Sequence, residues 1–573
     1  MNDSKIGSDR NIGGASRLFI GIAVGISFGL VMSIVSNCFV LAVQWLTSLR
    51  QVLIFDWFDF DSAFAPVTPL VFLLFAAVLI IQIRRALNIK RWHGPADSIF
   101  AAHRTDNELD VKCGFASTLA ALISAGGGAS VGQYGPLVHF GATIGSAFRK
   151  LTGGILTTDV FIGCGVAGAI SAGFNAPIAG VVFAHEAILR HFSMRAIAPI
   201  AVASISASWF SQQIFGFAPL LDFASMDLDL GLMLPAALIM GPIFGVFAVT
   251  FMACVRFSSL FAMRSGYSHA RLIFLAAAIT GAVGIFVPEI LGLGSGPLRV
   301  ILEGGYELGY LFVLVVGKIS LTALCIGFGL FGGVFSPALF VGAAAGALGG
   351  RIVAGVLGLA AAPVLAFCGM AAVASAVIGA PIAGVMIILE MTMNYELALV
   401  AMLSVVISCI VSNFFFGSSF FDRQLLDRGI DVSQGRGYIE MMETSILGAI
   451  STQFVTIDEA FTPKMAIDAL IQANQSEGYV VNTQGILLGK ITLQEMLTVK
   501  KEQHLDGVID KAPISIKHDA SLQQAIEVAS SFVGESIPIV QRKSGKLLGV
   551  VNEADLFELY LSLQARVTDL ERS

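Results

Sequence analysis

Long apolar segments alternate with short, Gly- and Pro-interrupted ones between residue 16 and about residue 430. Segments 17–47 and 67–83 are each long enough to cross a bilayer core of about 30 Å as helices. By contrast, segments 124–136 and 326–337 contain too much Gly and Pro for continuous helices. Non-helical backbone at membrane depth is tolerated only where it is buried in protein or lines a cavity. The pattern therefore predicts an all-α polytopic membrane domain built with broken helices.

The apolar region contains two related copies of one pattern. SAGFNAPIAGVVFAHE at 171–186 matches SAVIGAPIAGVMIILE at 375–390, and a Gly-rich stretch precedes each copy, beginning at Gly132 and Gly333. We expect a first repeat at about 16–215 and a second at about 230–430. Two Gly/Pro-broken segments in matching halves of a membrane protein indicate a binding site at the repeat interface.

Charged residues become frequent after about residue 441, which predicts a soluble C-terminal domain. We expect an N-terminal cytoplasmic segment at 1–15, a membrane domain at 16–430, a linker at 431–445 and the soluble part at 446–573. That part repeats strand, helix, strand, turn, strand, helix in two α/β units, 446–500 and 505–565. Basic residues directly after the second span suggest a cytoplasmic loop, and hence cytoplasmic N- and C-termini.

Composition agrees with a membrane protein, since 56% of the residues are hydrophobic and only 13% are charged. The net charge of −6 gives no reason to expect a nucleic-acid or anionic-lipid partner. The sequence contains no P-loop, HExxH or GxSxG motif, so an enzyme is not expected, and we predict no metal site.

Four ordered motifs resemble those of the CLC family of chloride channels and chloride/proton antiporters. They are GGGASVGQYGPLVHFGATIG from Gly126, RWHGPAD at 91–97, GGVFSPALF at 332–340 and GAPIAGVMIILEMTMNYELALVAML at 379–403. The C-terminal part resembles a tandem pair of CBS domains. The resemblance implies the CLC fold of two inverted-topology repeats and a homodimer in the lipid bilayer, here of the bacterial inner membrane. Chloride and similar monovalent anions would be the transported ions, with no cofactor required.

Helix N-termini suit a permeating anion, because their free N–H groups supply about half a positive charge without binding the ion too tightly. By resemblance, backbone amides at two helix starts bind anions, and a first-loop histidine and a late aromatic residue complete the pathway. These anion-binding residues are His93, Gly94, Gln133, Tyr134, Gly135, Val334, Phe335 and Phe421. Phe421 stands where the family has a tyrosine hydroxyl, so the central site has lost a donor.

Two carboxylates of the family's antiporters are missing. Tyr134 occupies the position of the gating glutamate, and a phenol with a pKa of about 10 is neutral at pH 7. We interpret Tyr134 as the gate, which could block the pore, swing aside or stand clear. The inner proton site normally has two adjacent acids, of which only Glu186 is present, followed by Ala187. His185 and Glu186 are therefore the candidate proton relay, with structural hydrogen bonding as the alternative for both.

These departures favour a chloride-selective channel that conducts passively through a pore in each subunit. One alternative is a chloride/proton antiporter with a non-standard proton route. The other is a CBS-regulated membrane sensor with vestigial transport. We interpret Glu390, an acid within an apolar segment, as a structural residue.

The tandem CBS domains leave two roles open. Adenine nucleotides are usually contacted by Ser or Thr after the last strand and by Asp three residues later. Here Thr492 precedes Glu495, and Asn552 precedes Asp555, so neither pattern is complete. Thr492, Asn552 and Asp555 are the candidate nucleotide contacts, and a structural, dimer-supporting tail is the alternative.

Overall fold

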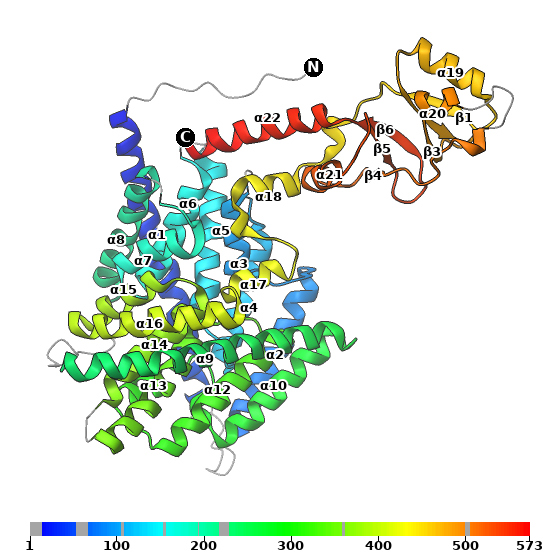
Figure 1. Ribbon diagram of the computed structural model, residues 1–573. Helices are drawn as coiled ribbons and strands as arrows, with labels where there is room; N and C mark the ends of the chain where they lie inside the picture. The colour runs from blue at the N-terminus through cyan, green and yellow to red at the C-terminus, as the bar shows by residue number, and fades with distance from the viewer. Residues whose placement is uncertain are drawn as a thin grey trace. The chain divides into compact units, whose positions relative to one another are not determined.

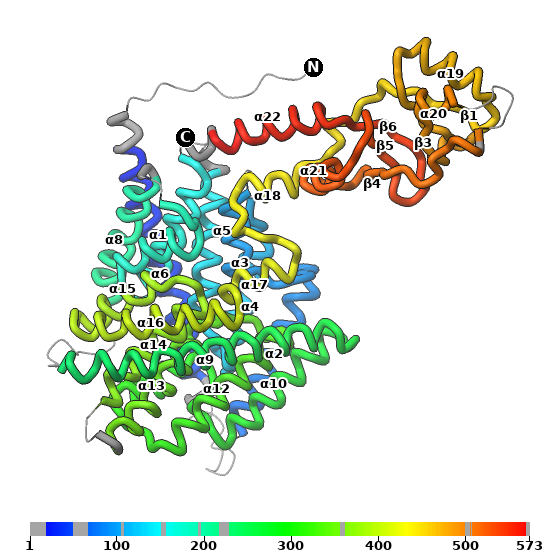
Figure 2. The backbone as a smooth tube through the Cα atoms, viewed as in Figure 1, coloured from blue at the N-terminus to red at the C-terminus, as the bar shows by residue number. Residues whose placement is uncertain are grey.

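A computed structural model describes residues 14–52, 67–104, 108–152, 156–192, 194–216, 229–357, 361–498 and 505–572. The expected N-terminal segment 1–15 lies almost entirely outside these residues. The chain forms two compact units, one ending at Gly429 and one beginning at Ile430, with His103–Thr105 assigned to the second (Figure 1). Figure 2 traces the same path through the Cα atoms. Each unit is described below by itself.

The described part of the first unit consists mainly of helices, which fall into two corresponding series. The first series is α1 (Gly14–Val52), α2 (Thr68–Ala86), α3 (Pro95–His103), α4 (Val111–Gly127), α5 (Tyr134–Thr152), α6 (Thr158–Phe174), α7 (Pro177–Phe183) with the π-helical η3 (Ala184–Leu189), and α8 (Met194–Phe215). The second is α9 (Leu230–Arg264), α10 (His269–Phe286), α11 (Ser295–Leu302), α12 (Leu308–Phe328), α13 (Phe335–Leu357), α14 (Ala362–Ile378), α15 (Pro381–Thr392) and α16 (Tyr395–Phe416), followed by α17 (Phe420–Leu426).

The expected breaks occur at matching points of the two series. Helix α4 ends before Gly128 at φ 102°, and α12 ends before Gly329 at φ 103°. Glycine tolerates this left-handed conformation without the steric cost that a Cβ brings. The chain then runs without helix until α5 and α13 begin, so the prediction of non-continuous helices at 124–136 and 326–337 is confirmed.

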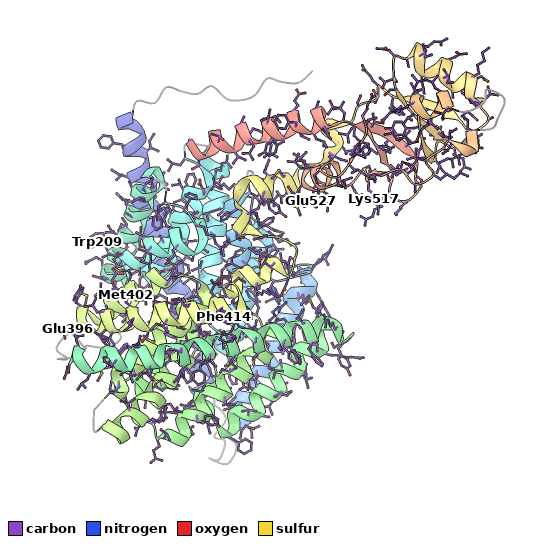
Figure 3. All side chains as sticks on the ribbon, in the orientation of Figure 1. Trp209, Glu396, Met402, Phe414, Lys517 and Glu527 are labelled. Carbon is purple, nitrogen blue, oxygen red and sulfur yellow. The ribbon has the colours of Figure 1, made fainter. Side chains whose placement is uncertain are left out.

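The outer surface of the first unit is apolar. In the described part, seven helices are long and apolar enough to cross a membrane, and several shorter apolar helices accompany them. Trp209, Met402 and Phe414 are among the exposed apolar side chains on α8 and α16 (Figure 3). The second unit instead exposes charged side chains such as Lys517 and Glu527. The predicted polytopic membrane fold is confirmed.

Two similar α/β halves make up most of the second unit. The first contains β1 (Val455–Asp458), α19 (Pro463–Gln472), β2 (Glu477–Val481), β3 (Leu487–Thr492) and α20 (Leu493–Thr498). The second contains β4 (Ile516–Lys517), α21 (Leu522–Ala529), β5 (Ile537–Val540), β6 (Leu547–Val551) and α22 (Glu553–Arg572). This is the predicted order of elements in both halves.

The two described sheets have the same topology. Each has its first strand parallel to its second, and its second antiparallel to its third, in the orders β1-β2-β3 and β4-β5-β6. Gly489 pairs with Val480, and Gly549 pairs with Ile539, so the two glycines hold equivalent positions. Within the expected linker 431–445, residues 435–443 form helix α18, which packs on α21 and α22.

Candidate functional site

The Gly-rich loops of the two repeats pair with each other through their backbones. Gly132 N–H donates to the Gly333 carbonyl at 2.7 Å, and Gly333 N–H donates to the Gly132 carbonyl at 2.6 Å. The pairing is antiparallel, as expected for repeats of opposite orientation. A Cβ on Gly132 would lie 2.8 Å from the Gly333 carbonyl oxygen, so neither loop has room for a side chain. This bridge fixes the starts of α5 and α13 next to each other.

Both helix starts present unused backbone donors. The first helical hydrogen bonds are accepted by Gln133 and Val334, from Leu137 and Ala338 respectively. Among the described residues, no acceptor is found for the N–H groups of Tyr134, Gly135 or Phe335. Together with the helix dipoles, these amides form a region of positive potential that suits an anion.

Tyr134 packs within an aromatic cluster instead of projecting alone. Its ring stacks on Phe174 with centroids 3.8 Å apart, and it meets Phe335 edge-on at 6.0 Å. Its hydroxyl donates to the Gly173 carbonyl at 3.3 Å. The cluster therefore joins the start of α5, the end of α6 and the start of α13.

A cavity borders this cluster. Its lining includes Gln133, Tyr134, Phe174, Ser336 and Glu390. Tyr134 thus forms part of a wall, and the gating role assigned to it from the sequence stays a prediction. Glu390 was interpreted as a structural acid, and its exposure to this cavity could not be found from sequence spacing.

In the loop before α3, the backbone amides of His93 and Gly94 are engaged, and the His93 side chain offers a donor. His93 N–H donates to Ser117 Oγ at 2.8 Å, and Gly94 N–H donates to Asp97 Oδ2 at 2.9 Å. Asp97 is fixed in turn by ion pairs with Arg91 and Arg428 at 2.7 and 2.9 Å. The buried Nδ1 of His93 has no hydrogen-bond partner. An anion here would be bound by the imidazole.

His139, to which the sequence assigned no role, lies beside His93. The ring centroids are 6.1 Å apart. Ser98 Oγ lies 2.8 Å from His139 Nδ1, which leaves Nε2 buried and without a hydrogen bond. His93 and His139 therefore each keep a buried, unpaired ring nitrogen among the described residues.

Phe421, the other predicted side-chain contact of the pathway, is buried on α17 and packs edge-on against Phe420.

The carboxylates of Glu186 and Glu390 each accept backbone hydrogen bonds from the other repeat. Ile382 and Ala383, at the start of α15, donate their N–H groups to the Glu186 carboxylate at 3.0 and 2.8 Å. Ile178 and Ala179, at the start of α7, donate to Glu390 at 2.9 and 2.7 Å.

Each carboxylate therefore caps the N-terminus of a helix in the other repeat. This is a structural role, because a carboxylate at a helix N-terminus offsets both the unpaired donors and the dipole. Neighbouring His185 places Nδ1 2.8 Å from the His191 carbonyl, and its Nε2 is buried without a partner. The relay role of His185 and Glu186 stays a prediction.

In the second unit, the candidate nucleotide contacts cap their own helices. Thr492 Oγ1 donates to Glu495 at 2.8 Å, and Asn552 Oδ1 accepts the N–H of Asp555 at 2.8 Å. Asp555 Oδ2 is buried and has no hydrogen-bond partner.

A separate polar cluster connects the two CBS-like halves. Lys490 Nζ lies 2.7 Å from Glu477, and both side chains are about nine-tenths buried. The Glu477 carboxylate also accepts the N–H groups of Glu535 and Ser536. Tyr479 donates its hydroxyl to the Ser536 carbonyl at 2.9 Å, and burial raises the pKa of Tyr479 to about 12.

Family models match both units. The model described as "Voltage gated chloride channel" matches residues 72–413, more than half of the chain. The chain belongs to this family. A CBS domain model matches residues 505–562, the second half of the C-terminal unit. The predicted CLC membership and the CBS-containing fold are confirmed, and the family is one of membrane transporters and channels, not of enzymes.

Individual relatives agree with this assignment. The H(+)/Cl(-) exchange transporter ClcA of Vibrio cholerae is 30% identical over 404 residues, which cover 67% of this chain and 83% of the relative. A Ralstonia nicotianae protein named as a ClcB-like chloride channel is 29% identical over 340 residues, which cover 58% of this chain and 79% of that protein.

Solved CLC structures have the same fold. A slow cyanobacterial Cl-/H+ antiporter aligns with a TM-score of 0.63 at 21% identity, over 71% of this chain and 97% of that one. A eukaryotic CLC transporter aligns with a TM-score of 0.62 at 19% identity, over 94% of this chain and 98% of that one.

The sequence-based expectation of a passive channel is wrong. The ClcA relatives from several Vibrio strains are named exchangers, which favours the antiporter alternative. The channel prediction rested on Tyr134 and Ala187, which stand where the family's antiporters have carboxylates. Glu186, Glu390 and His185 remain in the membrane unit, and ionisable groups at membrane depth are functional candidates by default.

Proposed function

We propose that this protein is a chloride/proton exchanger of the bacterial inner membrane. The observation that carries the anion half of the proposal is the Gly132–Gly333 bridge, which fixes two helix starts with unused amides side by side. The named exchangers among its relatives support the proton half.

Chloride would bind through partial charges. Moving a bare ion into a medium of low dielectric constant costs of the order of 20 kcal/mol, so the pathway must replace the ion's water. The amides of α5 and α13 do this without a full positive charge, which would retain the ion. The imidazole of His93 would supply a further donor on the route through the α3 loop.

Glu390 is the carboxylate we propose for proton uptake, because it lines the cavity that Tyr134 and Gln133 also line. Protonation of Glu390 would weaken the hydrogen bonds from Ile178 and Ala179, since a neutral carboxyl is a poorer acceptor. These amides lie four and five residues after Phe174, whose ring stacks on Tyr134. A proton on Glu390 would thereby affect the start of α5, and this coupling does not need a carboxylate at position 134.

Glu390→Gln tests this function. We expect proton flux in proteoliposomes to fall about a hundredfold, the usual scale for losing a positioned proton carrier, while chloride flux continues. Glu396→Gln is the matched control, because Glu396 is an exposed acid in the first turn of α16. Chloride and proton fluxes are measured in the same vesicles. Unchanged proton flux in Glu390→Gln would exclude this residue, and parallel loss of both fluxes would indicate a structural role only.

A homodimer with cytoplasmic termini completes the proposal. Membership of the family supports a dimer. The basic residues after α2 support a cytoplasmic loop there.

We further propose that the CBS-containing unit acts structurally and binds no adenine nucleotide. Thr492 and Asn552 are occupied as caps, and the Glu477–Lys490 cluster ties its two halves together. Titration calorimetry of the full-length protein with ATP, ADP and AMP should give no saturable heat. Saturable binding that disappears in Asp555→Ala would contradict this proposal.

A further inference from the structure

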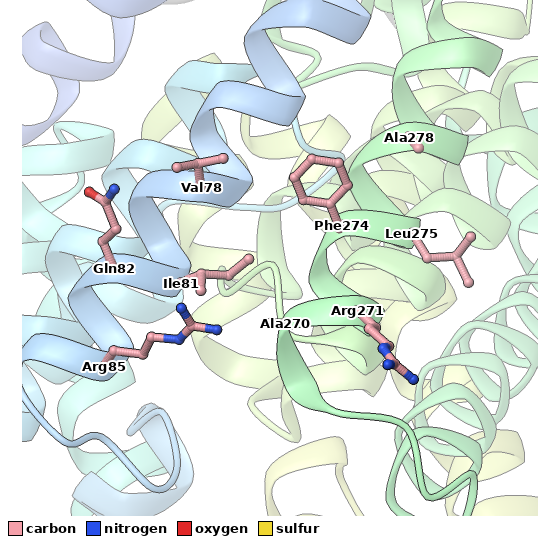
Figure 4. Close-up of a pocket in the computed structure, with 9 residues that line it drawn as sticks. All are labelled: Val78, Ile81, Gln82, Arg85, Ala270, Arg271, Phe274, Leu275 and Ala278. Atoms are coloured by element: carbon pink, nitrogen blue, oxygen red, sulfur yellow. The ribbon is translucent and has the colours of Figure 1, made fainter.

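A groove with one basic end runs between α2 and α10 on the membrane unit. Its volume is about 690 Å³, within the range of about 300–1,000 Å³ typical of ligand pockets. Most of its lining is apolar and includes Val78, Ile81, Phe274, Leu275 and Ala278. Arg85 on α2 and Arg271 on α10 lie on opposite sides of the groove towards the same end, and Phe274 and Val78 lie further along (Figure 4).

Within the described residues, Arg85 and Arg271 form no ion pair with an acidic side chain. Neighbouring Arg84 is engaged, since it donates to the Lys90 carbonyl at 2.7 Å and lies 5.9 Å from the centre of the Trp92 ring. For Arg85 and Arg271, the described residues provide neither an ion pair nor a hydrogen bond. Residues 67–96 and 230–288, which contain both helices and their adjoining loops, include no Asp or Glu. Although the whole chain has a net charge of −6, these two segments together are positively charged.

The start of α10 adds donors at the same end. Ser268 makes no side-chain cap, and its carbonyl accepts from Arg271 and Leu272. In the described part of the chain, no acceptor is found for the N–H groups of His269 and Ala270, and Ala270 lines the groove. Helix α10 is 18 residues long, and the unused N–H groups at its N-terminus attract phosphate oxygens. Arginine forms bidentate hydrogen bonds with a phosphate group as well.

We propose that this groove binds an anionic phospholipid. The phosphodiester and acidic headgroup would contact Arg85, Arg271 and the start of α10, while one acyl chain lies along Ile81, Phe274 and Ala278. This occupant matches both features at once, because a free anion leaves the apolar part exposed and a neutral lipid leaves the arginines unneutralised. Basic pockets between membrane helices bind acidic lipid headgroups in this way. The loop after α2 is expected on the cytoplasmic side, so the lipid would belong to the inner leaflet.

Native mass spectrometry of the full-length protein in detergent tests the proposal, with phosphatidylglycerol and phosphatidylcholine as the probes. We expect phosphatidylglycerol to bind more tightly, and Arg85→Gln/Arg271→Gln to weaken it about tenfold or more without altering phosphatidylcholine binding. Arg85→Gln and Arg271→Gln are also measured singly, and Lys112→Gln, which removes one exposed charge at the start of α4, is their matched control. Equal binding of both lipids, or full retention in the double variant, would overturn the proposal.

A second variant distinguishes a lipid from a free anion. Ala278→Trp fills the apolar part of the groove and leaves both arginines in place. We expect it to weaken phosphatidylglycerol binding. If inorganic phosphate displaces phosphatidylglycerol and Ala278→Trp has no effect, the occupant is a free anion and the lipid assignment is wrong.

Discussion

At the scale of single residues, the proposed anion site depends on two glycines, which have no side chain. Gly132 and Gly333 allow two backbones to pair across the repeat interface, and no larger residue fits at either position. The sequence indicated both glycines through their positions in matching motifs. It could not indicate that the amides of His93 and Gly94 are occupied, because one partner, Ser117, lies 24 residues away on α4.

Gly132→Ala is a direct test at this scale. The added Cβ would meet the Gly333 carbonyl oxygen at 2.8 Å, so the bridge must open or shift. We expect a loss of about 1–3 kcal/mol in stability and a reduced chloride flux. Gly309→Ala is the control, since nothing lies within 4 Å of the position of its Cβ. Thermal unfolding and chloride efflux are measured for both; equal behaviour of the two variants would show that the bridge is not required.

At the scale of elements, a glutamate from each repeat caps the start of a helix in the other repeat. Glu186 of η3 binds the start of α15, and Glu390 of α15 binds the start of α7. Proline stands at the start of both α7 and α15, where it suits the first helical turn. The exchange itself joins residues 196 and 212 positions apart in the sequence, and helical periodicity contains no information about such contacts.

The Glu477–Lys490 pair makes a prediction about β2 and β3. Lys490→Met leaves the Glu477 carboxylate buried without its cation, which costs about 3–5 kcal/mol. Glu477→Gln/Lys490→Met removes both charges and should be less destabilised. Hydrogen–deuterium exchange of the two strands in the full-length protein measures the difference. If the double variant exchanges as fast as Lys490→Met, the charge pair is not the source of the stability.

At the scale of the whole molecule, the sequence supplied the fold but not the mode of transport. Apolar length, Gly/Pro breaks and the 171–186 and 375–390 repeat were enough to predict the membrane architecture, since each is a local or self-similar pattern. The transport mode was predicted wrongly because it was inferred from two absent carboxylates. Glu390 faces the cavity beside Tyr134 only through the folded arrangement of α5, α6 and α15, which those local patterns do not contain.

Chloride-driven uphill proton movement tests the central claim most directly. Proteoliposomes are prepared with an outward chloride gradient, equal internal and external pH and equal potassium on both sides, and external pH is followed with valinomycin present to carry the compensating charge. We predict that chloride efflux drives protons into the vesicles, so that the external solution becomes alkaline, and that a proton uncoupler abolishes the change. Chloride efflux under the same conditions that moves no protons against a gradient would contradict the assignment of this protein as an exchanger.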